Sequence, residues 1–261
     1  MAHPLTKELK LFVSELADAS RKILGRARAL IPKVEVKSDA SPVTETDLLI
    51  ERTLRDMIAD RYPDHGILGE EHGSSNEAAE YVWVIDPIDG TLAFVAGVPV
   101  YGTLIGLAHN GRPLFGVIDH PATQDRWLGG PERGSTWNGK PIQIRSCADI
   151  GQAFLTTSNP DLLAPDELTA FLRLREKVQL TLYGASCYAY GLVASGRTDI
   201  GIDGGFDIFD MCAPAAVIQG AGGVVTDWNG APIDLNWKGR VVAAGDRDIH
   251  RKALAILNGS P

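Results

Sequence analysis

Two aspartates that follow a short apolar run are the most chemically suggestive residues of the chain. Asp86 and Asp89 stand three positions apart in the segment W-V-I-D-P-I-D-G-T, which spans residues 83–91. Pro87 stiffens the turn after the apolar run, and Gly90 permits backbone angles that a Cβ would resist. Two carboxylates held this close repel each other unless a cation neutralises them, and their hard oxygens suit Mg²⁺ better than zinc. The segment therefore predicts a Mg²⁺ site at the end of a buried strand.

The same segment also fits an ordinary surface turn, because Asp, Pro and Gly are common turn residues. The whole string D-P-x-D-G-T behind an apolar strand is rarer, with a chance match on the order of one in a million per start position. We therefore favour the metal site. Gly90 and Thr91 follow the second aspartate, and their backbone N–H groups could bind a phosphate oxygen if a helix starts there.

Other acidic residues become candidates once this site is posited. Glu70 follows a short apolar stretch in G-E-E, Asp47 closes V-T-E-T-D, and Asp210 precedes an Ala-rich segment. Each has an ordinary explanation when taken alone. A pair of glutamates usually lies in a solvated loop, whereas an Asp or Thr at the start of a helix, such as Thr46, Asp47 or Asp210, is by default its N-cap.

Helices and strands are expected in mixed order around these residues. Apolar residues recur at helical spacing over residues 5–27, and a second helix is expected from near Thr46 until shortly before Pro63. A short buried strand is expected at 81–85. Further strands are expected at 100–108, 114–118, 180–183, 199–202 and 223–226, and further helices at about 165–176, 186–196, 210–220 and 248–257. This order predicts an α/β or α+β fold of layered sheets and helices.

Composition narrows the range of partners and compartments. The chain has 261 residues, 44% of them hydrophobic and 22% charged, and can bury a core without disulfides. Its net charge of -8 opposes binding to nucleic acid, yet an acidic protein can bind a phosphorylated metabolite when divalent cations intervene. The three cysteines form no C-x-x-C motif, which predicts reduced thiols and a cytoplasmic location. We expect neither a secretory signal nor a membrane span, since no apolar stretch is long enough.

The acidic segments together resemble the inositol monophosphatase family. The resemblance rests on G-E-E at 69–71, W-V-I-D-P-I-D-G-T, the segment that begins F-D-M-C-A-P at Phe209, and V-T-E-T-D at 43–47 preceded by Lys37-Ser38. It runs from about residue 5 to 257. It implies a layered αβαβα sandwich formed by a single domain, residues 1–261, and a homodimer. The half at about 1–145 would carry most metal ligands, and the half at about 146–261 would carry Asp210 and the substrate contacts.

The resemblance also implies which residues bind metal. Glu70, Asp86 and the carbonyl of Ile88 would hold one Mg²⁺, and Asp86, Asp89 and Asp210 would hold a second. A third, weaker ion would depend on Glu70 and water, which gives two or three ions per site.

Catalytic and phosphate-binding roles follow from the same resemblance. Asp47 and Thr91 would form a hydrogen-bonded pair that orients or deprotonates the attacking water, with Glu70 as a further catalytic residue. The N–H groups of Gly90 and Thr91 would bind the phosphate. The implied activity is Mg²⁺-dependent hydrolysis of a phosphate monoester, and a non-catalytic metal- or phosphate-binding regulator is the less favoured alternative.

Two stretches are similar to the histidinol-phosphatase branch of the family. They are P-V-Y-G-T-L-I-G-L at 99–107 and Y-G-A-S-C-Y-A-Y-G-L at 183–192. That branch usually has G-G-D-C-Y-A-Y-G in the second stretch, so Ser186 replaces an acid that would face the substrate. Asp203 matches the family's substrate-binding Glu, and Ala185 and Ser186 would also contact the substrate. We expect L-histidinol phosphate as the substrate; inositol-1-phosphate or a broad range of small monoesters is the alternative.

Overall fold

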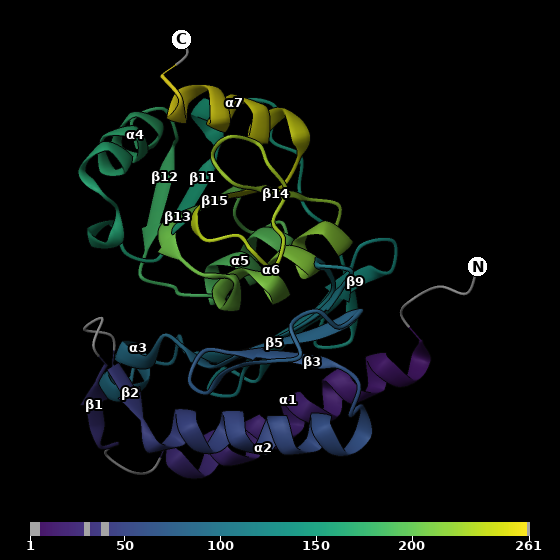
Figure 1. Ribbon diagram of the computed structural model, residues 1–261. Helices are drawn as coiled ribbons and strands as arrows, with labels where there is room; N and C mark the ends of the chain where they lie inside the picture. The colour runs from purple at the N-terminus through teal and green to yellow at the C-terminus, as the bar shows by residue number, and fades with distance from the viewer. Residues whose placement is uncertain (1–5, 29–31, 38–41, 260–261) are drawn as a thin grey trace.

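Five layers of secondary structure follow one another in the computed structural model, which describes residues 6–28, 32–37 and 42–259 (Figure 1). Two helices cover one face of a large sheet, two central helices separate it from a smaller sheet, and two more helices cover the outer face of the smaller sheet. The predicted αβαβα sandwich is confirmed.

The first layer consists of α1 (Lys7–Ala27) and α2 (Glu45–Arg61). The side chain of Thr6 caps α1 by accepting a hydrogen bond from the N–H of Leu9. The buried face of α1 includes Leu9 and Phe12, as the helical spacing predicted. Both predicted helices are confirmed, except that the part of the first prediction before residue 6 lies outside the described residues. Next to this layer, β1 (Val34–Val36) and β2 (Pro42–Thr44) form an antiparallel pair.

The second layer is an eight-stranded sheet in the order β10-β9-β8-β7-β6-β5-β3-β4. Its strands are β3 (Gly66–Gly69), β4 (Gly73–Ser75), β5 (Tyr81–Asp89), β6 (Gly102–His109), β7 (Arg112–His120), β8 (Asp125–Gly130), β9 (Gly134–Trp137) and β10 (Lys140–Ile142). The strand predicted to stop before Asp86 continues to Asp89, with a shift of register against β6 between the two aspartates. This irregularity lets both carboxylates leave one strand close together.

The upper layers contain the rest of the chain. The central helices are α5 (Tyr188–Ala194) and α6 (Ile208–Gly220), and the short α3 (Thr91–Ala96) follows β5. The second sheet has the order β12-β11-β13-β15-β14, made of β11 (Phe154–Thr157), β12 (Leu180–Tyr183), β13 (Ile200–Phe206), β14 (Val224–Thr226) and β15 (Gly239–Ala244). The outer helices are α4 (Pro165–Arg175) and α7 (Arg247–Leu257), and the 3₁₀ turns are η1 (Ile150–Gln152) and η2 (Pro160–Leu162).

Close contact between α6 and the large sheet sets the distance between the central helices and that sheet. A Cβ on Gly116 of β7 would lie 2.6 Å from the Cα of Ala213, so only glycine allows this approach. The start of α6 is thereby held near the ends of the strands that carry the acidic residues. No helix within the described ranges is long and apolar enough to cross a membrane.

Candidate metal centre

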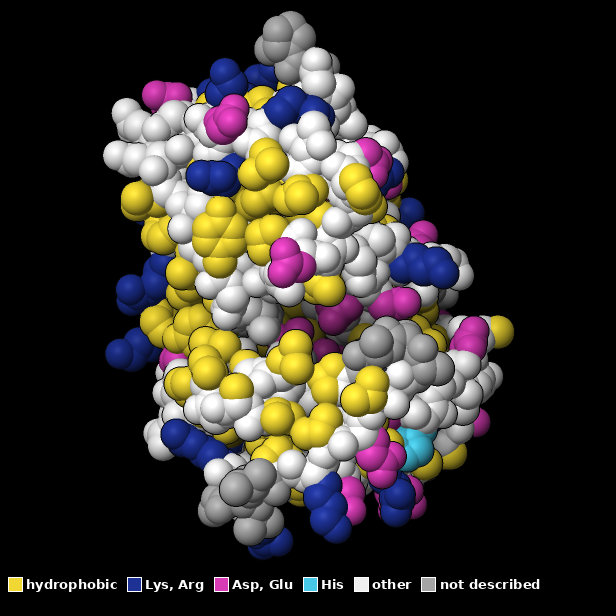
Figure 2. Space-filling view, turned by 90° about the vertical axis from the view of Figure 1, so that its left-hand side faces the viewer, with side chains coloured by type: hydrophobic (Ala, Val, Ile, Leu, Met, Phe, Trp, Pro, Cys, Tyr) yellow, Lys and Arg dark blue, Asp and Glu magenta, His cyan; other side chains and the backbone are white. Residues whose placement is uncertain are grey.

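Carboxylates from two layers of the fold meet at one point. Asp86 and Asp89 lie on β5 and Asp210 lies in the first turn of α6, and their oxygens come within 4.8 Å of one another. Figure 2 shows acidic side chains gathered in a hollow near the middle of one face. The structure therefore brings together three acids that lie far apart in the sequence.

Asp86 is the most deeply placed of the three acids. Its side chain is buried, and Oδ1 has no hydrogen-bond partner among the described residues. Burial raises the pKa of Asp86 well above its usual value, and the negative charges of neighbouring carboxylates raise it further. An ionised carboxylate in this position is costly unless a cation contacts it. The buried oxygen and the all-carboxylate donor set fit a hard divalent ion such as Mg²⁺.

Asp89 is oriented by a loop from the other half of the chain. Its Oδ2 accepts a 2.7 Å hydrogen bond from the backbone N–H of Cys187. Burial raises the pKa of Asp89, and hydrogen bonds from Cys187 only partly oppose this effect. The next residue, Gly90, has a φ of 80°, and a Cβ there would lie 2.9 Å from Oγ of Ser186. Both observations place the loop around Ser186 directly over the D-G turn.

Asp210 is positioned by the way α6 begins. The N-cap of this helix is Asp207, whose Oδ1 accepts from the N–H of Ile208 at 2.7 Å. The N–H of Asp207 in turn donates to Oδ2 of Asp210 at 2.7 Å. The default expectation that Asp210 is the cap is wrong, because the helix begins two residues earlier than predicted. Burial raises the pKa of Asp210 well above its usual value, and the negative charge of Asp89 raises it further.

Glu70 lies beside the three-acid cluster but is not part of it. Its side chain is 34% exposed, and Oε1 lies 3.1 Å from Nζ of Lys37. Lys37 also contacts Glu71 at 2.8 Å, and burial raises the pKa of Glu71 to about 7. The N–H of Glu70 donates to the carbonyl of Ile85, the residue before Asp86, at 3.1 Å, and the negative charge of Glu70 contributes to the raised pKa of Asp86. Glu70 could complete a metal site after a change of partner from Lys37.

The predicted hydrogen bond between Asp47 and Thr91 is not formed. Asp47 is at the third position of α2, where its Oδ2 accepts from both the N–H and the hydroxyl of Thr44, the N-cap residue. The hydroxyl of Thr91 donates instead to the carbonyl of Ile88 at 3.0 Å. A capping box therefore accounts for the observed position of Asp47. The default N-cap role suggested for Thr46 or Asp47 is taken by Thr44.

The backbone around Asp89 offers N–H and C=O groups that could bind a ligand. A helix does start at Thr91, as the phosphate-binding hypothesis required, and no described side chain caps it at Gly90. The first N–H groups of a helix have no partner within the helix and favour anions. The carbonyl of Ile88 accepts one hydrogen bond from Thr91 and keeps a second lone pair for a cation.

The predicted substrate residues differ in accessibility. Ser186 lies half-buried over Gly90, with a left-handed φ of 44°, and Ala185 is buried. Asp203 is enclosed: Oδ1 accepts hydrogen bonds from Thr157 and from the N–H and hydroxyl of Ser158, and Oδ2 accepts one from Tyr190. Burial raises the pKa of Asp203 to about 6, although these hydrogen bonds oppose the effect. Oδ2 keeps a second lone pair, but Asp203 is only 2% exposed, so a substrate could reach it only if the residues around it moved.

Sequence reasoning missed a buried glutamate that supports the Glu70 loop. Oε2 of Glu51 accepts from the N–H of Glu71 at 2.7 Å, and Oε1 accepts from the N–H of His72 at 3.0 Å. Nε of Arg55 donates to the same carboxylate at 2.8 Å. A Cβ on Gly69 would overlap this carboxylate. The available signal was a charged residue on the apolar face of a helix, next to the buried Ile50.

The turn that joins the two aspartates of β5 is also held from α1. The hydroxyl of Thr103 on β6 donates to the carbonyl of Pro87 at 2.8 Å. Ser20 of α1, which is completely buried, forms a hydrogen bond with the same hydroxyl. The first two layers of the fold therefore fix the backbone between Asp86 and Asp89.

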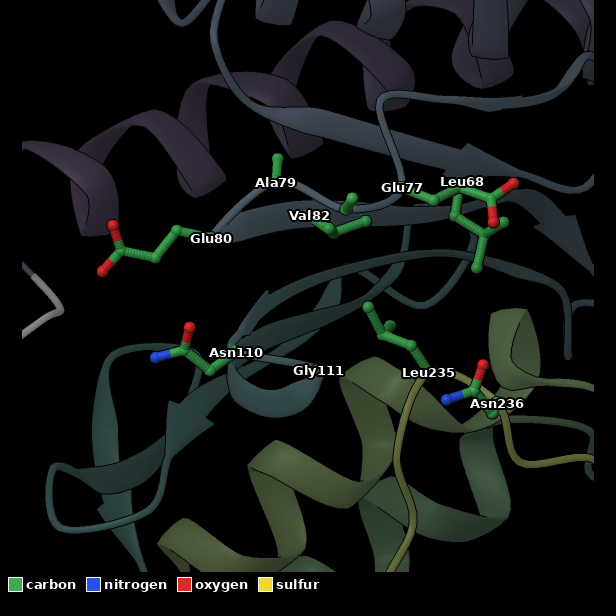
Figure 3. A pocket seen from close by; sticks show the side chains of 10 residues that line it. Leu68, Glu77, Ala79, Glu80, Val82, Asn110, Gly111, Leu235 and Asn236 are labelled. Atoms are coloured by element: carbon green, nitrogen blue, oxygen red, sulfur yellow. The ribbon is translucent and has the colours of Figure 1, made fainter.

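A separate cavity of about 280 Å³ opens between the large sheet and the loop around Leu235. Figure 3 shows Leu235 pointing toward the strand that carries Val82. Its two acids already have protein partners, since Glu80 contacts His109 at 2.9 Å and Glu77 bonds with Ser74. None of the three clustered aspartates lines it, so the metal chemistry lies elsewhere.

Comparisons with known proteins agree with the geometry. The profile described as the inositol monophosphatase family matches residues 6–260. The chain is 43% identical over 253 residues to the bifunctional phosphatase IMPL2, chloroplastic, of Arabidopsis thaliana, covering 93% of this chain and 72% of that protein. It is 34% identical over 260 residues to a histidinol-phosphatase of Chlorobaculum parvum, covering 98% of each. The solved structure of an inositol monophosphatase from Zymomonas mobilis superposes with a TM-score of 0.89 at 34% identity, covering 98% of this chain and 100% of that one.

Proposed function

The chain belongs to the inositol monophosphatase family and is a phosphoric monoester hydrolase, and we propose that its reaction requires Mg²⁺ held by Asp86, Asp89 and Asp210. The observation that carries this proposal is the approach of these carboxylates to within 4.8 Å, with a buried oxygen of Asp86 that lacks a partner. Glu70 and the carbonyl of Ile88 complete the proposed ligand set for two or three ions.

Bound Mg²⁺ would acidify a water molecule and offset the negative charge of the phosphoryl group. The chain's own residues supply position. The N–H groups of Gly90 and Thr91 bind the phosphate at the start of α3, where no described side chain competes for them. The hydroxyl of Thr91 orients the attacking water by exchanging its bond to Ile88 for one to that water. Asp47 acts with Thr91 in this proposal, although its observed partner is Thr44.

The test of metal dependence is phosphate release from a small monoester with and without Mg²⁺. Asp89→Asn is expected to abolish Mg²⁺-supported release while the protein stays folded. Asp149→Asn is the control, because Asp149 is an exposed aspartate that caps the distant turn η1. Near-normal turnover by Asp89→Asn would reject the site. Metal and phosphate binding without turnover across a broad panel of monoesters would favour a regulatory protein instead.

For the substrate, we propose L-histidinol phosphate, with inositol-1-phosphate or a broad set of small monoesters as the alternative. Support comes from the similarity to a histidinol-phosphatase and to a bifunctional phosphatase. The ammonium group of this substrate needs a carboxylate. Asp207 is the exposed acid three residues before Asp210, and it forms no ion pair within the described chain, whereas Asp203 is enclosed. We therefore assign the ammonium contact to Asp207, and a contact through Asp203 or Ser186 remains the alternative.

The substrate assignment is tested by comparing turnover of the two phosphates under identical Mg²⁺. Histidinol phosphate is expected to give the higher kcat/KM. A preference of about tenfold or more for inositol-1-phosphate, or 1.4 kcal/mol in transition-state binding, would overturn it.

We further propose a homodimer of single-domain subunits. β12 is the edge strand of the second sheet, and its Leu180 and Tyr183 are about half exposed. Figure 2 shows hydrophobic side chains grouped on this side of the molecule, and such a group typically marks an interface. Light scattering of the full chain, compared with Leu180→Glu, tests the proposal; a monomeric wild type would contradict it.

A reducing compartment, of which the cytoplasm is the simplest case, is also proposed. All three cysteines are free in the structure, as expected of proteins kept in reducing conditions. The Arabidopsis relative is described as chloroplastic. Fractionation of cells that express the tagged chain would test the location.

A further inference from the structure

A buried histidine and cysteine lie directly behind the Asp89 carboxylate. The backbone N–H of Cys187 donates to Oδ2 of Asp89 at 2.7 Å, and Sγ of Cys187 lies 3.3 Å from Nε2 of His120. His120 is completely buried and Cys187 is 2% exposed. Neither side chain belongs to the proposed metal ligands, and the proposed reaction does not use them. His120 ends β7, Cys187 lies in the loop before α5, and Asp89 ends β5, so these contacts connect three separate segments.

The surroundings of His120 make it a rigid support. Its ring packs edge-on against the rings of Trp127 and Tyr188, at centroid distances of 6.0 and 4.9 Å. A Cβ on Gly102 would lie 3.0 Å from both Cε1 and Nε2 of the ring, so the glycine leaves just enough space for it. Burial lowers the pKa of His120 to about 4, which keeps the ring neutral near pH 7.

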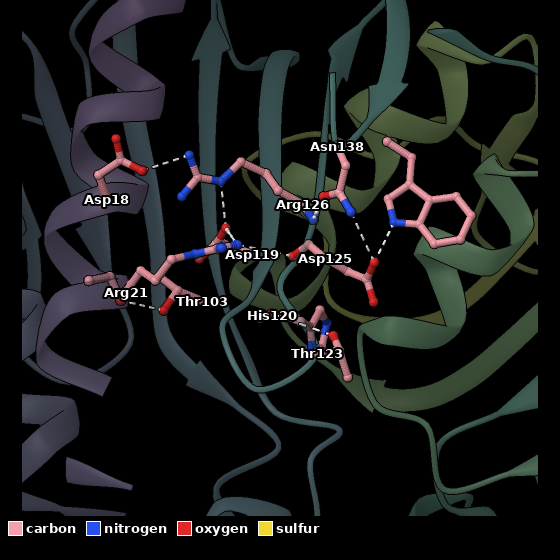
Figure 4. Close-up of polar contacts among 11 residues, drawn as sticks. Asp18, Arg21, Thr103, Asp119, His120, Thr123, Asp125, Arg126 and Asn138 are labelled. Carbon is pink, nitrogen blue, oxygen red and sulfur yellow. Dashed lines mark hydrogen bonds and ion pairs between the residues drawn. The ribbon is translucent and has the colours of Figure 1, made fainter. Parts of the chain in front are cut away.

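The backbone beside this histidine is anchored as well. Asp119, the preceding residue, accepts hydrogen bonds from Arg21 of α1 and from Arg126 of β8 (Figure 4). Its carboxylate is completely buried, and the bond from Nη2 of Arg21 is 2.7 Å long. The end of β7 is therefore held between two elements, and His120 has little freedom to move.

The loop that carries Cys187, in contrast, needs external support. Ser186 has a φ of 44°, a left-handed backbone conformation that residues other than glycine adopt only at a cost in free energy. The helix α5 begins only after Cys187, and Cys187 forms no side-chain cap for it. An anchor on the Cys187 side chain would keep its N–H aimed at Asp89. Groups that orient a metal ligand in this way typically change metal affinity by 10- to 100-fold.

We propose that His120 and Cys187 act as a positioning pair that fixes the orientation of Asp89 and thereby sets the affinity of the site for divalent cations. The inference rests on the proposed metal-binding role of Asp89. The pair touches neither the substrate nor the metal; it acts through one carboxylate. Oδ2 of Asp89 accepts the Cys187 N–H, and the Cys187 thiol also interacts with this carboxylate.

The test uses Mn²⁺ as the probe and follows its binding to the metal-free protein by the loss of the free-ion EPR signal. His120→Ala and Cys187→Ala are each expected to raise the Mn²⁺ Kd about tenfold. The double variant is expected to be little worse than either single variant, because the two side chains act through one contact. Cys187→Ser keeps a side-chain hydrogen-bonding group and is expected to recover most of the affinity.

Cys212→Ala is the matched control. Cys212 is also completely buried in the same core cluster, and the neighbours around its Sγ include Gly106 of β6. It should lose stability to a similar extent and keep its Mn²⁺ Kd within about twofold. Thermal unfolding of each variant confirms that the protein used is folded, and Cys187→Ala, which removes one sulfur atom, serves if His120→Ala does not fold.

The outcomes separate this inference from the proposed function. Unchanged Mn²⁺ affinity in folded Cys187→Ala, failure of Cys187→Ser to recover affinity, or fully additive losses in the double variant would overturn the positioning pair. Wild-type protein that does not bind Mn²⁺, or that binds it equally well after Asp86→Asn, would instead overturn the metal site itself. Loss of affinity in Cys187→Ala with recovery in Cys187→Ser would support both.

Discussion

The carboxylate of Glu51 accepts the backbone N–H of Glu71 at 2.7 Å, and so a completely buried acid of α2 holds the loop that presents Glu70. A second N–H, that of His72, and the guanidinium of Arg55 complete the set of donors around it. A loop that supplies a metal ligand is thereby tied to a rigid helix. The relationship links the stability of the fold to the geometry of the site.

Glu51→Gln is expected to lower both stability and metal affinity. The amide replaces one acceptor oxygen by a donor, which leaves a buried N–H and part of the Arg55 charge unmatched. We expect a loss of about 2 kcal/mol in the free energy of unfolding and a several-fold higher Mg²⁺ concentration for half-maximal activity. Urea unfolding and Mg²⁺ titration measure the two effects. Glu45→Gln, an exposed change on the same helix, should stay within about 0.5 kcal/mol; equal effects of both variants would contradict the proposed support.

Asp86→Asn is expected to stabilise the metal-free protein. Burial and neighbouring negative charges raise the pKa of Asp86 well above its usual value, so its ionised form destabilises the fold at pH 8. The amide removes this charge, and the melting temperature in EDTA should rise by several degrees. Mg²⁺ should raise the melting temperature of the wild type but not that of Asp86→Asn. Calorimetry in EDTA and in Mg²⁺ tests both results, and a variant that melts lower in EDTA would argue against a strained carboxylate.

Mg²⁺ should raise the melting temperature of the wild type more at pH 8 than at pH 6. Protons compete with the cation for Asp86, Asp89 and Asp210, because the pKa of each carboxyl is raised. Dye-monitored melting across this range gives the comparison. If Mg²⁺ raised the melting temperature equally at pH 8 and pH 6, these carboxylates would not be the groups that bind the ion.

Asp203 gives stability an unusual dependence on pH. Its folded pKa of about 6 lies above the unfolded value of 3.8, so between these values the folded protein binds a proton that the unfolded chain does not. The contribution of Asp203 to the free energy of unfolding is therefore fully present below about pH 4. It falls by about 3 kcal/mol as the pH rises through 6. Asp203→Asn should remove this fall from the pH profile of unfolding. Parallel profiles for the two proteins would contradict the raised pKa.

Asp207→Asn is expected to weaken binding of the substrate's ammonium group without impairing phosphate hydrolysis itself. Asn caps helices as well as Asp does, so α6 and Asp210 should keep their positions. KM for histidinol phosphate should rise about tenfold, as expected for the loss of one charge-assisted hydrogen bond, whereas KM for a phosphate monoester without an ammonium group should not change. If Asp203→Asn alone gives this pattern, the enclosed acid rather than the exposed one contacts the substrate.

Asp47→Asn and Thr44→Val distinguish catalysis from helix capping. Both variants weaken the capping box between these residues, and each should cost about 1 kcal/mol. A catalytic Asp47 predicts that kcat falls about 100-fold or more in Asp47→Asn and changes little in Thr44→Val. Equal modest losses would restrict Asp47 to its structural role. Steady-state kinetics beside urea unfolding gives both quantities.

The local features of the site could be predicted from the sequence. The spacing of Asp86 and Asp89 and the strand before them depend on apolar periodicity and turn residues, which short segments carry by themselves. The helix at Thr91 was only a condition of the phosphate-binding hypothesis, and the structure supplied it. The layered α/β fold followed from the same patterns. The strands β2, β3, β4, β8, β9, β10, β11 and β15 were not predicted, because most are short and many include Gly, Ser, Thr or Lys. In β11 even Thr156 and Thr157 are buried.

The partners of each side chain were decided only by the tertiary structure. Asp47 bonds to Thr44 rather than to Thr91, Asp203 is enclosed by Tyr190 and Ser158, and the N–H that orients Asp89 comes from Cys187. A hydrogen bond depends on a few tenths of an ångström between segments that only packing brings together, and no local pattern encodes that distance. The sequence by itself determined which acids could bind a cation, and the fold decided which oxygens are left free to do so.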